Sequence, residues 1–176
     1  MSLLKVKADD FYLGTAEFSE DLIKDLTSEN LARVEGETVY INKYEIYKLL
    51  QDNKIVLIDQ NGEIINPEKY FKKYKNVLSL KLESVLVYLE LRQKQLKVRE
   101  SGSKIFEFIA GDERGEKYYI KIILEGNKYT FNDLQKFIKT SIMRKKEPLL
   151  AIVERDGEVI FYKLFELKGE EIESDH

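Results

Sequence analysis

Five cations stand close together in the chain and are the first candidates for chemistry. Between positions 133 and 146 they accompany a single acid: Lys136, Lys139, Arg144, Lys145 and Lys146. At a helix-to-strand corner such side chains can hold phosphate groups, arginine through forked hydrogen bonds and lysine as a point charge. Cations at the end of a helix also complement the helix dipole and keep the surface soluble. The residues by themselves leave both interpretations open.

An acidic turn and the strand after it form a second candidate. The segment ERDGE at 154–158 contains Asp156 and Glu158, and its Asp-Gly pair is typical of a two-residue hairpin. The turn is either a solvated hairpin tip or an acidic loop that reaches a basic pocket on a partner subunit. The next segment, which holds Val159 and Phe161, is apolar on both faces. Such a last strand is either central in its sheet or covered by another chain, so these four residues are candidates for a subunit interface.

Several residue types that carry chemistry are missing from the sequence. Cysteine is absent, which excludes disulfides and thiolate metal ligands. The single histidine is His176, so an internal histidine general acid and a histidine-rich metal site are excluded as well. The sequence shows no glycine-rich phosphate loop, no nucleophile elbow and no carboxylate pair at a catalytic spacing. We therefore expect neither a metal nor a cofactor.

The composition is that of a globular chain with many charges. Of 176 residues, 29 are Lys or Arg and 32 are Asp or Glu, which gives a net charge of −3. This balance argues against a protein whose whole surface is positively charged for binding nucleic acid, but it permits a local basic patch. Charged residues reach 35% and tryptophan is absent, a thermophile-like pattern. No apolar run approaches the ~20 residues that span a bilayer and no secretory signal is recognisable, so we expect a soluble cytoplasmic protein.

The chain divides into two predicted domains and a tail. Residues 1–76 read as a small mixed α/β domain, in which Ser19 and Asn42 start helices, an Asn-Gly turn joins two strands, and Pro67 opens a surface helix. Residues 77–168 read as helix, strand, strand, helix, strand, strand, with a polar loop at 111–116. This order predicts an α/β (α+β) fold whose C-terminal domain has a mixed central sheet flanked by helices. Residues 169–176 form an acidic tail.

The order of several motifs resembles that of archaeal tRNA-splicing endonucleases. VYLELR at 87–92 with LKVR at 96–99 is similar to the family pattern Y-x-D-L-R … G-Y-x-V-K, which opens the catalytic domain. FEFI at 106–109 is similar to the family's A-D-F strand. The segment 139–162, which ends in LLAIVERDGEVIFY, is similar to R-x-A-x-S-V-R-K … L-L-A-I-V-D-x-D-G-D-V-x-Y-Y. Because residues 41–63 also resemble the family's N-terminal domain, the resemblance covers most of the chain and implies a nuclease-like C-terminal domain.

The resemblance implies RNA chemistry, with departures at two positions. Members cleave precursor tRNA at bulge-helix-bulge junctions, where a 2′-hydroxyl attacks the adjacent phosphate and leaves a cyclic phosphate and a free 5′-hydroxyl. A tyrosine acts as general base, a histidine as general acid, and a lysine stabilises the charged transition state. The tyrosine position falls at about Gly111 and the histidine position at about Glu116. The lysine region survives as Arg144, Lys145 and Lys146, without a unique match because nearby lengths differ.

The missing base and acid indicate which kind of subunit this chain resembles. Loss of one positioned general acid typically costs about 10² to 10⁴ in rate, and some archaeal enzymes pair a catalytic subunit with a related structural one as α2β2. We therefore expect this chain to be the non-catalytic structural subunit. Its expected partners are a catalytic endonuclease subunit and precursor tRNA, and no membrane association is expected. The family's acidic loop inserts into a basic pocket of a neighbour, which implies that role for Asp156 and Glu158. The candidate RNA-binding residues are Lys139, Arg144, Lys145 and Lys146.

Two alternatives remain open at this point. One is a self-sufficient nuclease that uses Lys145 or Lys146, with Glu116 as the proton shuttle. The other is an orphan RNA- or protein-binding module that kept the fold and lost the reaction.

Overall fold

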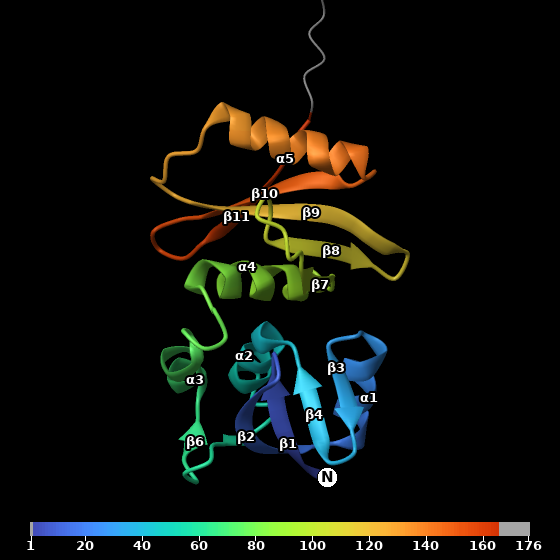
Figure 1. Cartoon of the computed structure of the whole chain (residues 1–176), viewed down its shortest axis with the longest axis vertical. Helices are drawn as coiled ribbons and strands as arrows, with labels where there is room; N and C mark the ends of the chain where they lie inside the picture. Colours follow the sequence, from blue (N-terminus) through green and yellow to red (C-terminus); the bar gives the residue numbers. More distant parts are fainter. Residues whose placement is uncertain (1, 166–176) are drawn as a thin grey trace, which may run out of the picture. The chain divides into compact units, whose positions relative to one another are not determined.

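The computed structural model describes residues 2–165 and separates into two compact units (Figure 1). Unit 1 is Met1–Leu89 and unit 2 is Glu90–His176, and each is described by itself. The division falls inside helix α4 (Leu82–Gln93), which is continuous across it. Since a division by compactness need not coincide with one by domain, the boundary predicted after residue 76 stays a prediction. The expected tail at 169–176 lies outside the described residues.

Unit 1 contains a six-stranded sheet in the order β3-β4-β1-β2-β5-β6. The parallel pair is β1 with β4, and the other neighbours are antiparallel. Its elements are β1 (Ser2–Ala8), β2 (Phe11–Phe18), α1 (Glu20–Ser28), β3 (Ala32–Glu35), β4 (Thr38–Ile41), α2 (Lys43–Gln51), β5 (Leu57–Ile58), β6 (Ile64–Ile65) and α3 (Pro67–Tyr74). Strands β1, β2 and β3 are absent from the sequence-based prediction of this region.

The helices of unit 1 begin where local sequence signals place them. The side chain of Ser19 accepts a hydrogen bond from the backbone N–H of Leu22, and Asn42 does the same for Tyr44. These contacts satisfy N–H groups that have no partner inside the helix. Helix α3 begins at Pro67 as predicted, but it is not simply a surface helix. Its two tyrosines, Tyr70 and Tyr74, are buried because their rings extend the core while their hydroxyls donate to backbone carbonyls.

Unit 2 contains a five-stranded mixed sheet in the order β11-β10-β9-β8-β7. Strands β9 and β10 are parallel, and the other neighbours are antiparallel. Its elements after α4 are β7 (Lys97–Glu100), β8 (Phe108–Asp112), β9 (Gly115–Leu124), α5 (Phe131–Met143), β10 (Glu147–Val153) and β11 (Val159–Lys163). Helix α5 makes the crossover between the parallel strands and packs against β10. The mixed α/β class predicted from the sequence is confirmed.

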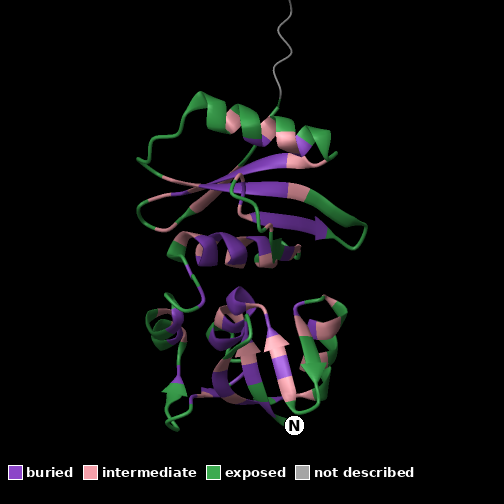
Figure 2. Cartoon of the chain, viewed as in Figure 1, coloured by how far each residue is buried: buried purple, intermediate pink, exposed green. Residues whose placement is uncertain are grey.

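The central strands of unit 2 are covered on both faces (Figure 2). On β9, Tyr119 is only 4% exposed because its ring stacks on Phe106, with 4.1 Å between the ring centroids. Phe137 of α5 joins the same cluster. The N-cap of α5 is Thr130, whose side chain accepts a hydrogen bond from the backbone N–H of Asp133. None of the helices among the described residues has both the length and the hydropathy to span a membrane.

Candidate functional site

The tight hairpin between β8 and β9 brings two of the predicted positions together. The sequence predicts a polar loop at 111–116, but β8 continues to Asp112 and β9 begins at Gly115. Gly111 and Glu116 are register partners in this hairpin, next to a bulge that follows Ala110. The loop prediction was wrong because the turn needs only a few residues, and its Asp112 accepts a hydrogen bond from the N–H of Arg114.

The backbone around Gly111 has no space for a side chain. A Cβ atom built on this glycine would lie 2.0 Å from the carbonyl oxygen of Gly115 and 2.7 Å from the Cα of Glu116. Both are backbone atoms of the facing strand, so the hairpin would have to open to admit any larger residue. A tyrosine at this position is therefore incompatible with the observed hairpin.

Glu116 is exposed and is contacted by two cations, one at its carboxylate and one at its backbone carbonyl. The Nε of Arg99, on β7, lies 2.5 Å from its Oε1, and Lys146 donates to its backbone carbonyl at 2.6 Å. The hydrogen bond from Arg99, with a smaller contribution from its charge and that of Lys146, lowers the pKa of Glu116 below the ordinary value. The side chain is therefore ionised at neutral pH, and it can accept a proton but has none to give.

The candidate basic residues lie at the end of α5 and just after it. Lys139 and Arg144 are exposed, and Arg144 is the C-cap of the helix. Lys145 adopts a left-handed backbone with φ of 55° and donates its N–H to the carbonyl of Ile142. Lys146 is the one of the four whose side chain contacts Glu116. The structure thus brings Gly111, Glu116 and Lys146 into one neighbourhood. Among the described residues, Lys139 and Arg144 form no hydrogen bond or ion pair with these three.

The β10–β11 hairpin presents the predicted acidic tip. Gly157 has φ of 93° and donates its N–H to the carbonyl of Glu154, as the Asp-Gly signal predicts. One carboxylate oxygen from each of Glu154, Asp156 and Glu158 lies within 4.8 Å of the others. Asp156 and Glu158 are both exposed. The tip is therefore a concentrated negative charge on the surface of unit 2.

Strand β11 is the edge of the described sheet. It pairs with β10 along Val159–Lys163, and no other described strand lies on its far side. Val159 and Phe161 are half-buried and Tyr162 is 49% exposed. The Nζ of Lys94 lies 5.9 Å from the centroid of the Phe161 ring. The alternative in which this strand is central in its own sheet is therefore wrong for the isolated chain, which leaves a partly apolar edge.

Arg99 is a site residue that the sequence reasoning missed. Its role depends on the register of β7, β8 and β9, which places it within reach of Glu116 seventeen positions away. The only sequence signal is a cation in the LKVR segment, which the predicted strand order did not count as a strand, and single cations are common in a lysine-rich chain.

A family model and two relatives show what this chain is similar to. Residues 81–161 match the family model described as tRNA intron endonuclease, catalytic C-terminal domain. A tRNA-splicing endonuclease from Methanococcus maripaludis is 24% identical over 156 residues, which are 86% of this chain and 88% of that protein. One from Thermococcus onnurineus is 24% identical over 132 residues, 72% of this chain and 75% of that protein.

A search of solved structures gives a weaker likeness. A Holliday junction resolvase from the archaeal hyperthermophile Archaeoglobus fulgidus covers 44% of this chain and 72% of its own, at 12% identity and a TM-score of 0.38.

Proposed function

We propose, since residues 81–161 relate this chain to the tRNA intron endonuclease family, that it is the non-catalytic structural subunit of such an enzyme. In this proposal it assembles with a catalytic subunit, as α2β2, and the assembly cleaves introns from precursor tRNA at bulge-helix-bulge junctions. The pairing of Gly111 with Glu116 is the observation that carries the proposal.

The two positions cannot supply the base and the acid of the family reaction. Gly111 has no side chain, and its backbone admits none without a rearranged hairpin. Glu116 is ionised and paired with Arg99, so it has no proton for the leaving 5′-oxygen. Lys146 remains beside them. Its charge can stabilise the phosphate in the transition state, but it cannot replace both the proton transfer to the base and the proton transfer from the acid. We therefore assign the family's lysine position to Lys146.

The acidic tip and the edge strand support assembly. A concentrated negative charge complements a basic pocket, and such complementarity favours encounter and fixes register. An open strand edge can be extended by a strand of another chain. We accordingly propose Asp156 and Glu158 as contacts to a basic pocket of the partner, and Val159 and Phe161 as contacts across a strand-to-strand interface. The proposed RNA-binding residues remain Lys139, Arg144, Lys145 and Lys146.

A cleavage assay on a bulged precursor tRNA tests the function. The purified chain alone is expected to release no intron, and addition of a catalytic subunit is expected to produce ends with a cyclic phosphate and a 5′-hydroxyl. The catalytic subunit alone and a mixture with unrelated protein serve as controls. Specific cleavage by the homogeneous chain alone would overturn the proposal.

Charge reversal at the tip tests the assembly. In a mixture with the catalytic subunit, the variant Asp156→Lys with Glu158→Lys is expected to form a smaller complex. Size exclusion with light scattering measures the mass of that complex. The matched control is Asp112→Lys with Glu113→Lys, which makes the same charge change at the exposed tip of the β8–β9 hairpin. An unchanged mass for the first variant, or an equal loss in both, would contradict the proposed contact.

The self-sufficient nuclease is the runner-up, and the Arg99 contact argues against it. It requires Glu116 to shuttle a proton, whereas the lowered pKa keeps this carboxylate charged. Loss of a measurable cleavage activity in Glu116→Gln would favour it. Salt-sensitive RNA binding without any association with an endonuclease subunit would favour the orphan binding module instead.

A further inference from the structure

The exposed face of the unit 1 sheet carries a row of alternating cations and tyrosines. Arg33 on β3 pairs with Tyr40 on β4, Tyr40 with Lys7 on β1, and Lys7 with Tyr12 on β2. Paired residues of neighbouring strands share one face of a sheet. Val39, the residue before Tyr40, is 1% exposed and faces the core. The row therefore lies on the opposite, outer face.

Tyr40 is held between the two cations. The Cζ of Arg33 lies 4.3 Å from the centroid of the Tyr40 ring, and the Nζ of Lys7 lies 5.5 Å from it. Because these side chains come from the two strands on either side, the ring is braced from both directions. The Arg33 side chain is 64% exposed. A guanidinium plane backed by an aromatic ring and open to solvent is a surface on which an unpaired base can stack.

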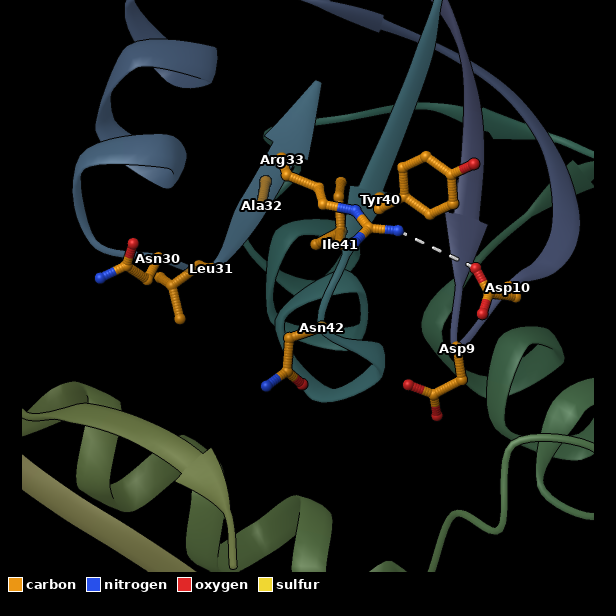
Figure 3. Close-up of a pocket in the computed structure, with 9 residues that line it drawn as sticks. All are labelled: Asp9, Asp10, Asn30, Leu31, Ala32, Arg33, Tyr40, Ile41 and Asn42. Atoms are coloured by element: carbon orange, nitrogen blue, oxygen red, sulfur yellow. Dashed lines mark ion pairs between the residues drawn. The ribbon is translucent and has the colours of Figure 1, made fainter. Parts of the chain in front are cut away.

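A pocket opens beside this stack. It has a volume of about 380 Å³, within the range of about 300–1,000 Å³ that is usual for small-ligand sites. Its lining combines Arg33 and Tyr40 with polar groups from the ends of neighbouring elements (Figure 3): Asp9, Asp10, Asn30 and Asn42, with Leu31, Ala32 and Ile41 as the apolar part. A pocket with this lining offers both a stacking plane and hydrogen-bonding groups.

The acids in the pocket have cations beside them. The Arg33 guanidinium lies 4.0 Å from a carboxylate oxygen of Asp10, and the Lys43 ammonium lies 3.4 Å from one of Asp9. Lys43 does not itself line the pocket, and Arg33 also lies 3.3 Å from a carboxylate oxygen of Glu35. The charge of the two acids is therefore only partly balanced, and any attraction for a phosphate has to come from other cations of the same face. The carboxylate oxygens remain able to accept hydrogen bonds from N–H groups of a ligand.

We propose that this pocket holds one unpaired guanine of an RNA strand. The base stacks on the guanidinium of Arg33, and one of the two carboxylates accepts from its Watson–Crick edge. Guanine is the RNA base whose edge offers two adjacent N–H donor groups, a match for the two oxygens of one carboxylate. Lys5, which is exposed one row away on the same face, and Lys7 are placed to contact the phosphates. This site goes beyond the proposed function and does not require the chain to be non-catalytic.

Fluorescence anisotropy with the full chain tests the proposal. The probes are labelled single-stranded uridine RNAs that carry a central pair of guanosines, inosines or adenosines, used at low salt because phosphate contacts weaken as salt rises. The guanosine probe is expected to bind most tightly, and inosine, which lacks the 2-amino group, more weakly. Arg33→Lys keeps the positive charge but removes the planar guanidinium on which the base stacks. It is expected to weaken guanosine binding about tenfold, the usual effect of losing one base-stacking contact.

A second variant and a matched control complete the test. Tyr40→Ala removes the support of the guanidinium and is expected to match Arg33→Lys. Thr38→Ala, on the same strand and face but in the next row, is expected to leave binding unchanged. Equal affinity for all probes, or unchanged affinity in both variants, would overturn the proposal. So would variants that weaken only the complex with a catalytic subunit, because the row would then be a protein contact.

Discussion

Replacement of Gly111 by alanine measures how firmly the β8–β9 hairpin excludes a side chain. The added Cβ would lie 2.0 Å from the carbonyl oxygen of Gly115, and the strand that carries this oxygen has to move. Overpacking by a methyl group costs about 1–3 kcal/mol, and a displaced strand also weakens ladder hydrogen bonds worth about 1 kcal/mol each. Because both neighbours are backbone atoms, we expect a loss of about 3 kcal/mol in the free energy of unfolding.

Thermal unfolding followed by circular dichroism, with urea unfolding beside it, gives the measurement. For a chain of 176 residues each kcal/mol corresponds to about 2–4 °C, so Tm is expected to fall by about 6–12 °C. The control is Gly102→Ala, where φ is 65° and no atom lies within 4 Å of the new carbon. It pays only the left-handed backbone cost of about 1–2 kcal/mol. The reasoning is refuted if Gly111→Ala is no less stable than this control.

Three further predictions concern the same unit. Gly111→Tyr combined with Glu116→His is expected to leave the purified chain without intron cleavage, because the tyrosine cannot enter the hairpin; cleavage by this variant in the precursor tRNA assay would contradict this. Arg99→Gln is expected to raise the pKa of Glu116 toward its ordinary value in an NMR titration. The lowered pKa stabilises the folded state above the unfolded value of 4.5 and loses this effect as pH falls through the folded value, so the stability difference between Arg99→Gln and the unchanged chain should shrink in acid. Thr130→Ala is expected to cost about 1 kcal/mol in urea unfolding through loss of the α5 N-cap, and an unchanged midpoint would argue against the cap.

Local signals were sufficient for the starts of three helices and for one hairpin turn. The caps at Ser19, Asn42 and Thr130 and the turn at Gly157 were all predictable, because each rests on contacts between residues a few positions apart. The acidic character of the β10–β11 tip was predictable too, because the acids of residues 154–158 flank the Asp-Gly pair that forms the turn. The short span of these interactions is what makes them readable in a sequence.

Features that depend on strand register were not predictable. The Arg99–Glu116 contact requires three strands to align, and the burial of Tyr119 requires both faces of β9 to be covered. Periodicity indicates which residues share a face but not which face is covered. The exclusion of a side chain at Gly111 arises from a bulge that only the paired strands reveal.

The open edge of β11 has a consequence for how mutations act on it. A strand that joins this edge would be held chiefly through main-chain N–H and C=O groups, which every residue except proline offers in full. Most substitutions along β11 would leave such a seam intact. Deletion of a single residue within β11 would instead shift the register by one, so that each later side chain of the strand would point to the opposite face of the sheet. Along this sheet edge, the number of residues in the strand therefore matters more than the identity of their side chains.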